Sequence, residues 1–118
     1  MLFLCYPKCS TCAAAKNWLD EKAVSYTERN IKSDPPSIDE LTKWLAQSGS
    51  PLKRFFNTSG LSYRALGLKD RLPAMPEEEQ LRLLASDGML VKRPILVGDG
   101  FVLVGFKPQE WESALKKT

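Results

Sequence analysis

The feature that most constrains this chain is the stretch Leu2–Leu19, which reads LFLCYPKCSTCAAAKNWL. Its first residues, 2–6, are apolar and end at Pro7, a pattern typical of a short buried strand. From Ala13 onward the residues have high helix propensity, and their apolar positions recur at helical spacing. The stretch therefore predicts a strand, a turn and a helix, with a Cys-Ser-Thr-Cys motif at the start of that helix.

A cysteine at the N-terminal end of a helix is favoured as an anion, because unpaired backbone N–H groups and the helix dipole stabilise negative charge there. Cys9 has this position, and Lys8 precedes it. A thiol so placed can have its pKa lowered from ~8.5 into the range of about 3.5–7.5. Cys12 is one helical turn further on the same face, so it can attack an adduct on Cys9 and release it by forming a disulfide. The motif predicts a reactive pair, with Cys9 as nucleophile and Cys12 as resolving thiol.

Three other interpretations of the motif are a zinc half-site, a structural disulfide and chance. Structural zinc requires four Cys or His ligands, whereas the chain has 3 Cys and no His, so no metal site is predicted. An odd and sparse set of cysteines, with no segment resembling a secretory signal, argues against a disulfide scaffold. The motif alone is only moderately specific, but a preceding strand and a following helix favour redox chemistry.

Length and composition predict a single domain over residues 1–118 with a hydrophobic core, since 43% of the residues are hydrophobic. No apolar run approaches the ~20 residues of a membrane span. The net charge is only +3, and the basic and acidic residues are interspersed, so direct nucleic-acid binding is not expected. We expect a cytoplasmic monomer, in a compartment where thiols stay reduced unless they are at work.

The remaining elements follow from local patterns. Residues 24–31 alternate apolar and polar side chains and predict a second strand, parallel to the first. Residues 37–40 form a Ser-x-x-Glu capping box that opens a helix. Its expected buried face carries Ile38, Leu41, Trp44 and Leu45.

Further short helices are predicted around residues 53–57 and 62–66, a loop continues through Pro73, and another helix follows Pro76. Residues 94–104 predict a hairpin around a Gly-Asp-Gly turn, and a closing helix follows. The order βαβ, helices, ββα predicts an α/β thioredoxin/glutaredoxin-like fold in which residues 37–88 are an inserted helical block.

Several motifs carry a resemblance to a known family. They are Tyr6-Pro-Lys-Cys-Ser-Thr-Cys12, Glu28-Arg-Asn-Ile31, Lys92-Arg-Pro-Ile95 and Val104-Gly-Phe106, and together they extend over nearly the whole chain. The chain resembles the ArsC/Spx family, thioredoxin-fold proteins that include glutaredoxin-coupled arsenate reductases and the transcriptional regulator Spx.

The resemblance implies that Cys9 is the nucleophile and that Arg93 holds an oxyanion, next to Pro94, which is cis in thioredoxin folds. Arsenate reductases have further arginines where this chain has Asn57 and Lys107, so it departs from the arsenate pattern at two of three positions.

The glutaredoxin-coupled reductases have serine in place of Cys12, so an internal disulfide is available only here. Lys8, Ser10 and Thr11 are further candidates for binding an anion or a thiol. Cys5 lies on the buried strand and is expected to be inert, and the three tryptophans are expected in the core.

The expected function is that of a thiol-dependent oxidoreductase of the arsenate reductase-like class. It needs no bound cofactor, accepts a disulfide or an oxyanion, and is reset by an external thiol such as glutathione, bacillithiol or a thioredoxin-type protein. The alternative is an Spx-like redox-sensing transcriptional regulator that binds the C-terminal domain of the RNA polymerase α-subunit.

Overall fold

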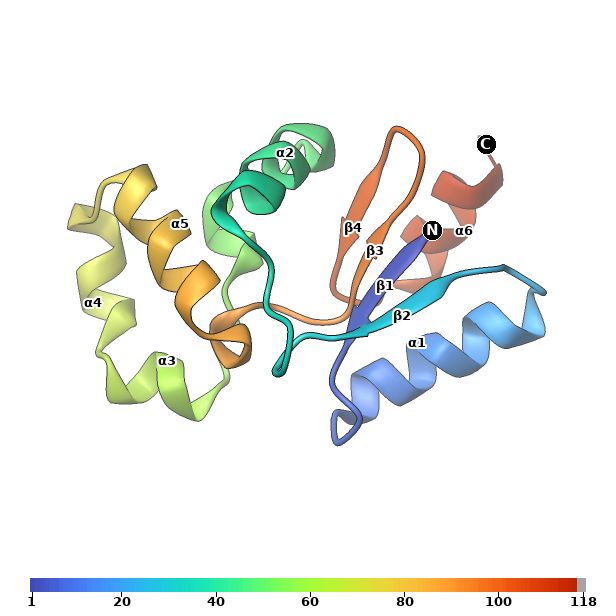
Figure 1. Cartoon of the computed structure of the whole chain (residues 1–118), viewed down its shortest axis with the longest axis horizontal. Helices are drawn as coiled ribbons and strands as arrows, with labels where there is room; N and C mark the ends of the chain where they lie inside the picture. Colours follow the sequence, from blue (N-terminus) through green and yellow to red (C-terminus); the bar gives the residue numbers. More distant parts are fainter. Residues whose placement is uncertain (117–118) are drawn as a thin grey trace.

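The computed structural model describes residues 1–116, and in this part of the chain four strands form one sheet (Figure 1). The strands are β1 (Leu2–Cys5), β2 (Thr27–Asn30), β3 (Ile95–Val97) and β4 (Val102–Val104), and their order in space is β2-β1-β3-β4. β1 pairs parallel with β2 and antiparallel with β3, and β3 pairs antiparallel with β4. The predicted thioredoxin-like βαβ…ββα arrangement is therefore confirmed.

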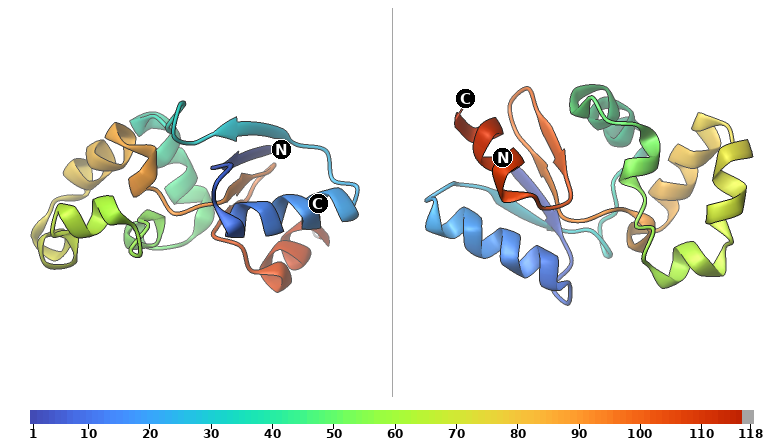
Figure 2. Two further views of the ribbon diagram at one scale, coloured as in Figure 1. Left: turned by 90° about the horizontal axis from the view of Figure 1, so that it is seen from below. Right: turned by 180° about the vertical axis from the view of Figure 1, so that it is seen from behind.

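The two faces of the sheet pack against different helices, because successive side chains of a strand point to opposite sides. Phe3 and Cys5 of β1 belong to a hydrophobic cluster that includes residues of α1 (Ser10–Glu21) and α6 (Pro108–Lys116). Leu4 belongs to a second cluster, with residues of α2 (Ile38–Ser48) and the helices after it. Figure 2 shows α1 and α6 on one side of the sheet and the other helices beyond its other side.

Trp111 of α6 organises the first of these clusters. Its side chain is fully buried, and its ring makes edge contacts with Phe106, Trp18 and Phe3 at centroid distances of 5.0, 6.1 and 6.4 Å. Its indole Nε1 donates a hydrogen bond of 3.0 Å to the carbonyl of Gly105. This bond fixes the segment that leaves β4. Trp44 is also buried, as predicted, whereas Trp18 is half-buried.

Between β2 and β3 the chain is helical. After α2 come the 3₁₀ helix η1 (Leu52–Phe55), α3 (Leu61–Ala65), α4 (Leu68–Arg71), the 3₁₀ helix η2 (Leu72–Ala74), α5 (Glu77–Ser86) and the 3₁₀ helix η3 (Gly88–Leu90). The loop expected through Pro73 was wrong, because α4 and η2 occupy it. Gly67, in the left-handed conformation at φ 63°, turns the chain from α3 into α4, and Leu68 and Leu72, one turn apart, are both buried.

Two further expectations needed correction at the ends of elements. The second strand extends only over Thr27–Asn30, and its side chains are exposed or half-buried, because β2 is an edge strand paired only with β1. Ile38 is 40% exposed, whereas Leu41 and Trp44 are buried as predicted. Ile38 is the first residue of α2, and helical spacing does not tell whether a neighbour covers the end of a helix.

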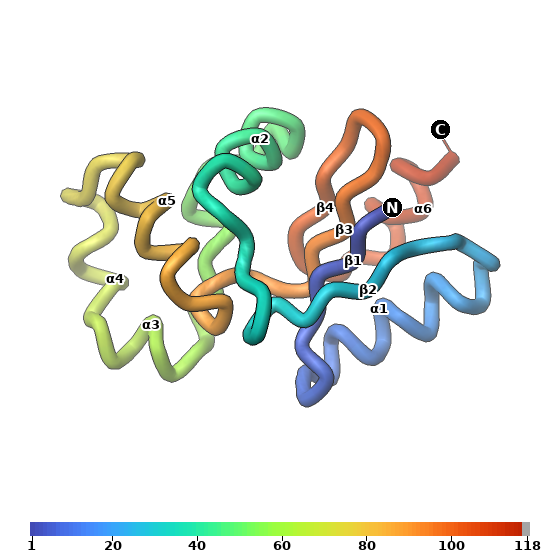
Figure 3. The backbone as a smooth tube through the Cα atoms, in the orientation of Figure 1, coloured from blue at the N-terminus to red at the C-terminus, as the bar shows by residue number. Residues whose placement is uncertain are grey.

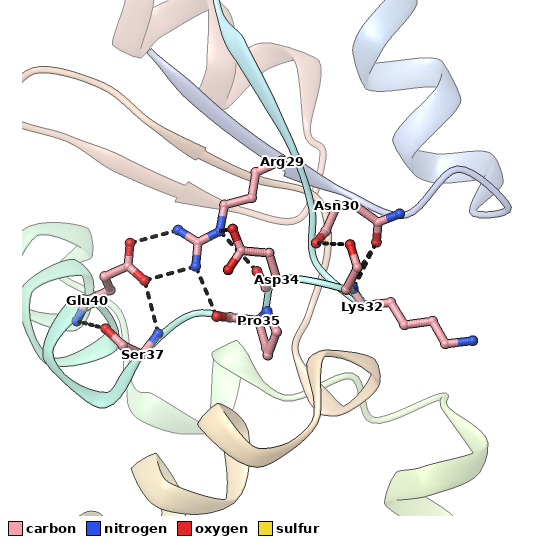
Figure 4. A network of polar contacts seen from close by, with 8 residues as sticks. Arg29, Asn30, Lys32, Asp34, Pro35, Ser37 and Glu40 are labelled. Atoms are coloured by element: carbon pink, nitrogen blue, oxygen red, sulfur yellow. Dashed lines mark hydrogen bonds and ion pairs between the residues drawn. The ribbon is translucent and has the colours of Figure 1, made fainter.

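Arg29 on β2 attaches α2 to the sheet (Figure 4). Its guanidinium donates to both carboxylate oxygens of Glu40 at 2.7 and 3.0 Å, and also to the carbonyls of Asp34 and Pro35 at 3.0 and 2.9 Å. Glu40 also accepts from the N–H of Ser37 at 3.0 Å, and the Ser37 hydroxyl accepts from the N–H of Glu40 at 3.1 Å. The predicted capping box is present. The hydrogen bond from Arg29 is the main reason why the pKa of Glu40 is lowered to about 2.

A second connection joins the helices to the sheet where the chain returns from α5 to β3, a path that Figure 3 traces. Phe56 and Val91 form an isolated antiparallel bridge. The N–H of Asn57 donates to the carbonyl of Leu90, and the N–H of Lys92 to that of Phe55, both at 2.7 Å. The residues after η1 are thereby held beside the residues that precede β3.

Candidate functional site

The turn between β1 and α1 places Cys9 at the entrance of the helix, as predicted. Cys9 is the N-cap residue of α1, with extended backbone angles of φ −94° and ψ 120°. Its own N–H donates to the carbonyl of Tyr6 at 2.9 Å, which closes the turn that contains Pro7. The side chain of Cys9 is half-buried. A sulfur in this position faces the free N–H groups of the first helical turn.

These surroundings lower the pKa of Cys9 below its ordinary value. Partial burial acts to raise it, because a thiolate is less well solvated inside the protein. The backbone N–H of Cys12, the Cys12 thiol, the backbone N–H of Thr11 and the positive charge of Arg93 act in the opposite direction, and together they prevail. The Cys9 thiol is therefore more acidic than an ordinary cysteine, because the N–H groups at the start of the helix, the Cys12 thiol and the charge of Arg93 stabilise its thiolate.

Cys12 differs sharply from Cys9. It is only 3% exposed, and the N–H of Tyr6 donates to its sulfur at 3.3 Å. Burial is the main reason why its pKa rises to about 12, and the hydrogen bond and charge of Cys9 raise it further. Both thiols are free rather than joined in a disulfide. In this reduced state one sulfur of the pair is acidic and partly accessible, and the other is buried and protonated.

Cys5 is the third free thiol, and it is buried as expected. Burial raises its pKa to about 11, and the nearby carboxylate of Glu28 acts in the same direction. A thiol with this pKa is almost entirely protonated at neutral pH, so it is a poor nucleophile.

Cys9 lines a hollow of about 630 Å³. Of the residues singled out from the sequence, Thr11, Asn57, Arg93 and Lys107 also line it. Lys8 and Ser10 are exposed and are not part of its lining, so the structure does not bring them into the hollow. Pro94 is buried and is not part of the lining, and the Arg93–Pro94 peptide bond is cis, as the resemblance implied.

Sequence reasoning missed three cationic residues that line the same hollow. They are Lys53 and Arg54 of η1 and Lys92, which precedes Arg93. The bridge between Phe56 and Val91 brings these two distant segments together. No local pattern in the sequence predicts this pairing. The one available signal was that two basic residues, Lys53 and Arg54, are adjacent in the sequence.

Arg93 is held in place from two sides. Its guanidinium lies over the ring of Tyr6, with 5.5 Å from Cζ to the ring centroid. Its Nη1 makes long hydrogen bonds of 3.4 Å to the carbonyls of Met89 and Val91. Among the described residues its buried Nε has no hydrogen-bond partner. The charge of Arg93 acts on Cys9 and lowers the pKa of its thiol, and no Asp or Glu of the described residues lines the hollow around the two.

The segment after β4 also lines the hollow, next to the Arg93–Pro94 segment. Gly105 adopts a left-handed conformation at φ 76°, and its N–H donates to the carbonyl of Pro94 at 2.8 Å. A Cβ at this position would lie 3.3 Å from Cε of Lys92, so the glycine also leaves room for the lysine side chain. Gly105 thus lies beside Lys92 and leads into Phe106 and Lys107, which line the same hollow.

Neither a metal-binding cluster nor a membrane-spanning helix is present in the part of the chain that the structure describes. No group of three or more His, Cys, Asp or Glu side chains is arranged to hold a metal ion there. No helix within residues 1–116 is long and apolar enough to cross a membrane.

The fold and this site define a class: thioredoxin-like proteins with a cysteine pair at the start of the first helix and an arginine before a cis-proline. Comparison with known families is more specific, since a model of the ArsC family matches residues 4–114. The chain belongs to the ArsC family.

Individual relatives extend this result. The uncharacterised protein YusI of Bacillus subtilis is 51% identical over 112 residues, which cover 95% of each chain. The global transcriptional regulator Spx 1 of Bacillus cereus is 30% identical over 112 residues, covering 95% of this chain and 84% of the regulator.

Among solved structures, an ArsC family related protein from Bacteroides fragilis is 57% identical and superposes with a TM-score of 0.93, covering 95% of this chain and 94% of that one. A possible arsenate reductase from Streptococcus mutans is 49% identical, with a TM-score of 0.86 over 94% of this chain and 96% of that one.

Proposed function

We propose that this protein is a thiol–disulfide oxidoreductase of the arsenate reductase-like class, in which Cys9 is the nucleophile and Cys12 resolves the adduct. The observation that carries the proposal is the division of acidity within the pair. Cys9, at the open hollow, has a lowered pKa, whereas the pKa of buried Cys12 is raised to about 12. Of the two sulfurs, that of Cys9 is therefore the more readily ionised, and it is the one that a substrate can reach.

The reaction begins when the Cys9 thiolate attacks one sulfur of a substrate disulfide. The substrate S–S bond breaks, a mixed disulfide with Cys9 forms, and the first thiol leaves with the electron pair and takes up a proton. Cys12 then loses its proton and attacks the Cys9 sulfur, which releases the second thiol. The pair is oxidised to a Cys9–Cys12 disulfide while the substrate is reduced to two thiols. An external thiol such as glutathione, bacillithiol or a thioredoxin-type protein reduces the pair again and is itself oxidised to a disulfide.

The raised pKa of Cys12 fits this order of events. Burial contributes most to it, but the hydrogen bond and charge of Cys9 also contribute. Both of these Cys9 effects are lost once the Cys9 sulfur is bonded to the substrate. The N–H of Tyr6, which already donates to the Cys12 sulfur, stabilises a thiolate there. Cys12 thus becomes more acidic at the stage at which it must attack.

Arsenate is the weaker substrate in this proposal. The resemblance assigned three arginines to oxyanion binding, and here the hollow is lined at two of these positions by Asn57 and Lys107. Lysine keeps the charge but lacks the planar guanidinium that holds two oxygens at once, and asparagine has no charge.

The test is mass spectrometry of the intact protein after mild oxidation. The wild type and Cys5→Ala are expected to lose two hydrogens, whereas Cys9→Ser and Cys12→Ser are not. After reaction with a small disulfide, Cys12→Ser should retain a mixed disulfide on Cys9, because nothing resolves it. Oxidation of Cys9→Ser with the same mass loss as the wild type would refute the assignment.

A second function is favoured by the similarity to Spx 1, which extends over 95% of this chain. We propose, as the alternative, a redox-sensing regulator that binds the C-terminal domain of the RNA polymerase α-subunit and uses the cysteine pair as a switch. Pull-down with that domain, before and after oxidation of the pair, separates the two. Binding that changes with oxidation supports the regulator, and its absence in both states, together with disulfide turnover, supports the enzyme.

A further inference from the structure

The hollow in front of Cys9 concentrates positive charge to an unusual degree. Five cationic side chains line it, although the net charge of the whole chain is only +3. They are Lys53, Arg54, Lys92, Arg93 and Lys107. Among the described residues of the lining there is no carboxylate. Its volume of about 630 Å³ is that of a site for a small organic molecule, and a tetrahedral oxyanion would fill only a small part of it. The expected ligand is therefore an extended molecule with more than one negative charge.

The two arginines of the hollow are held very differently. Arg93 is fixed by the Tyr6 ring and by two backbone carbonyls. Arg54, on η1, instead forms an ion pair with Glu110 of α6, at an Nη2–Oε2 distance of 3.8 Å. The two side chains are 40% and 49% exposed. A long and solvated ion pair of this kind contributes little to stability, so Arg54 can leave it at small cost.

Arg54 also lies at the boundary between two hollows. It lines the one at Cys9 and a second hollow of about 650 Å³, which is lined by Glu110 and by residues of β4. Its guanidinium can therefore exchange Glu110 for another carboxylate without moving to a different part of the molecule. An arginine can hold a carboxylate through two parallel hydrogen bonds, which are stronger than its present contact with Glu110.

We infer that Arg54 is the specificity-determining residue of the thiol site, and that it leaves Glu110 to bind a carboxylate of the substrate where the two hollows meet. The substrate class is a small thiol or disulfide that carries at least two carboxylates. This inference rests on the proposed function for its chemistry. It adds the charge pattern of the substrate and the role of a residue that the family resemblance did not indicate.

Binding is tested apart from chemistry with S-methylglutathione, which has two carboxylates and cannot form a disulfide. Its dissociation constant is measured by NMR titration for Cys9→Ser and for the same protein with Arg54→Gln, Glu110→Gln or both. Arg54→Gln is expected to weaken binding by about tenfold, the loss of one charge-assisted contact. Glu110→Gln is expected to tighten binding a few-fold, and the double variant to behave like Arg54→Gln.

Arg82→Gln is the matched control, since Arg82 forms an exposed ion pair with Glu78 away from both hollows. It should leave the affinity unchanged. Equal affinities with and without Arg54, or tighter binding in Glu110→Gln that persists when Arg54 is also replaced, would overturn the inference.

Turnover experiments test the proposed function and the role of Arg54 separately. With Cys9 intact, Arg54→Gln should lower kcat/KM for oxidised glutathione about tenfold more than for the uncharged hydroxyethyl disulfide. Reaction with neither disulfide in the wild type would refute the proposed function, while the binding experiment still decides the role of Arg54. Reaction with both, at a ratio that Arg54→Gln leaves unchanged, would refute the inference alone.

Discussion

Replacing Glu40 by glutamine tests how the helices are attached to the sheet. The substitution keeps the size of the side chain and its ability to cap α2, but removes the charge that faces Arg29. The pKa of Glu40 is held at about 2 rather than at its ordinary 4.5. A difference of that size corresponds to roughly 3–4 kcal/mol at most. Because the Glu40 side chain is 34% exposed, solvent screens part of this energy, and we expect a loss of about 1–2 kcal/mol in the free energy of unfolding at pH 7.

The effect should depend on pH in one direction. A carboxylate whose pKa is lowered by folding stabilises the protein fully above its unfolded pKa, and this stabilisation is lost as the pH falls through the folded value. The difference between wild type and Glu40→Gln should therefore be constant near neutrality, shrink below pH 4.5 and vanish near pH 2. Urea unfolding followed by tryptophan fluorescence at a series of pH values measures it.

Glu78→Gln is the matched control. Glu78 pairs with Arg82 at 2.7 Å, as short as the contact between Arg29 and Glu40, but the two side chains are 78% and 63% exposed. We expect a change of no more than about 0.5 kcal/mol. A Glu40→Gln protein as stable as the wild type, or an equal loss in Glu78→Gln, would refute the reasoning from burial.

Three further outcomes can be checked separately. Iodoacetamide should alkylate Cys9 at a lower pH than an ordinary thiol, because the pKa of Cys9 is lowered. Cys12→Ala should raise that pKa, because a stabilising contact is lost, and an unchanged pH profile of alkylation would contradict this. Arg93→Gln should also raise that pKa, so that alkylation slows more at pH 6 than at pH 9, and an equal slowing at both would indicate a different role. Gly88→Ala should lower the free energy of unfolding by about 2 kcal/mol or more, because a Cβ would collide with the backbone carbonyl of Ile31, and an unchanged melting temperature would show that the backbone adapts.

Much of the fold follows from local signals. The apolar strand before Pro7, the cysteine at the helix entrance and the capping box at Ser37 depend on neighbours within a few residues, and the structure confirms all three. The prediction of a loop through Pro73 was wrong because it, too, relied on local signals alone. The left-handed Gly67 was read only as the end of a helix, although it also begins the next one.

The site was less accessible to sequence reasoning, because its walls come from segments far apart in the chain. Cys9, Arg93 and Asn57 were found through motifs or through resemblance. Arg54 was not, because its place in the hollow depends on the pairing of Phe56 with Val91, and neither residue has a feature that specifies the other. Likewise, a net charge of +3 for the whole chain does not predict that five cationic side chains line one hollow.

The bridge between Phe56 and Val91 has a consequence for how such a protein can diversify. Cys9 and the amides that lower the pKa of its thiol lie at the start of α1, whereas a separate stretch, residues 51–59, forms one side of the hollow at that sulfur. Exchanging this stretch between relatives would thus redirect which molecules are admitted and leave the reactivity of the thiol intact. The segment that selects the bound molecule and the segment that sets the pKa of the Cys9 thiol are different parts of one small chain. Each can therefore change in evolution without the other.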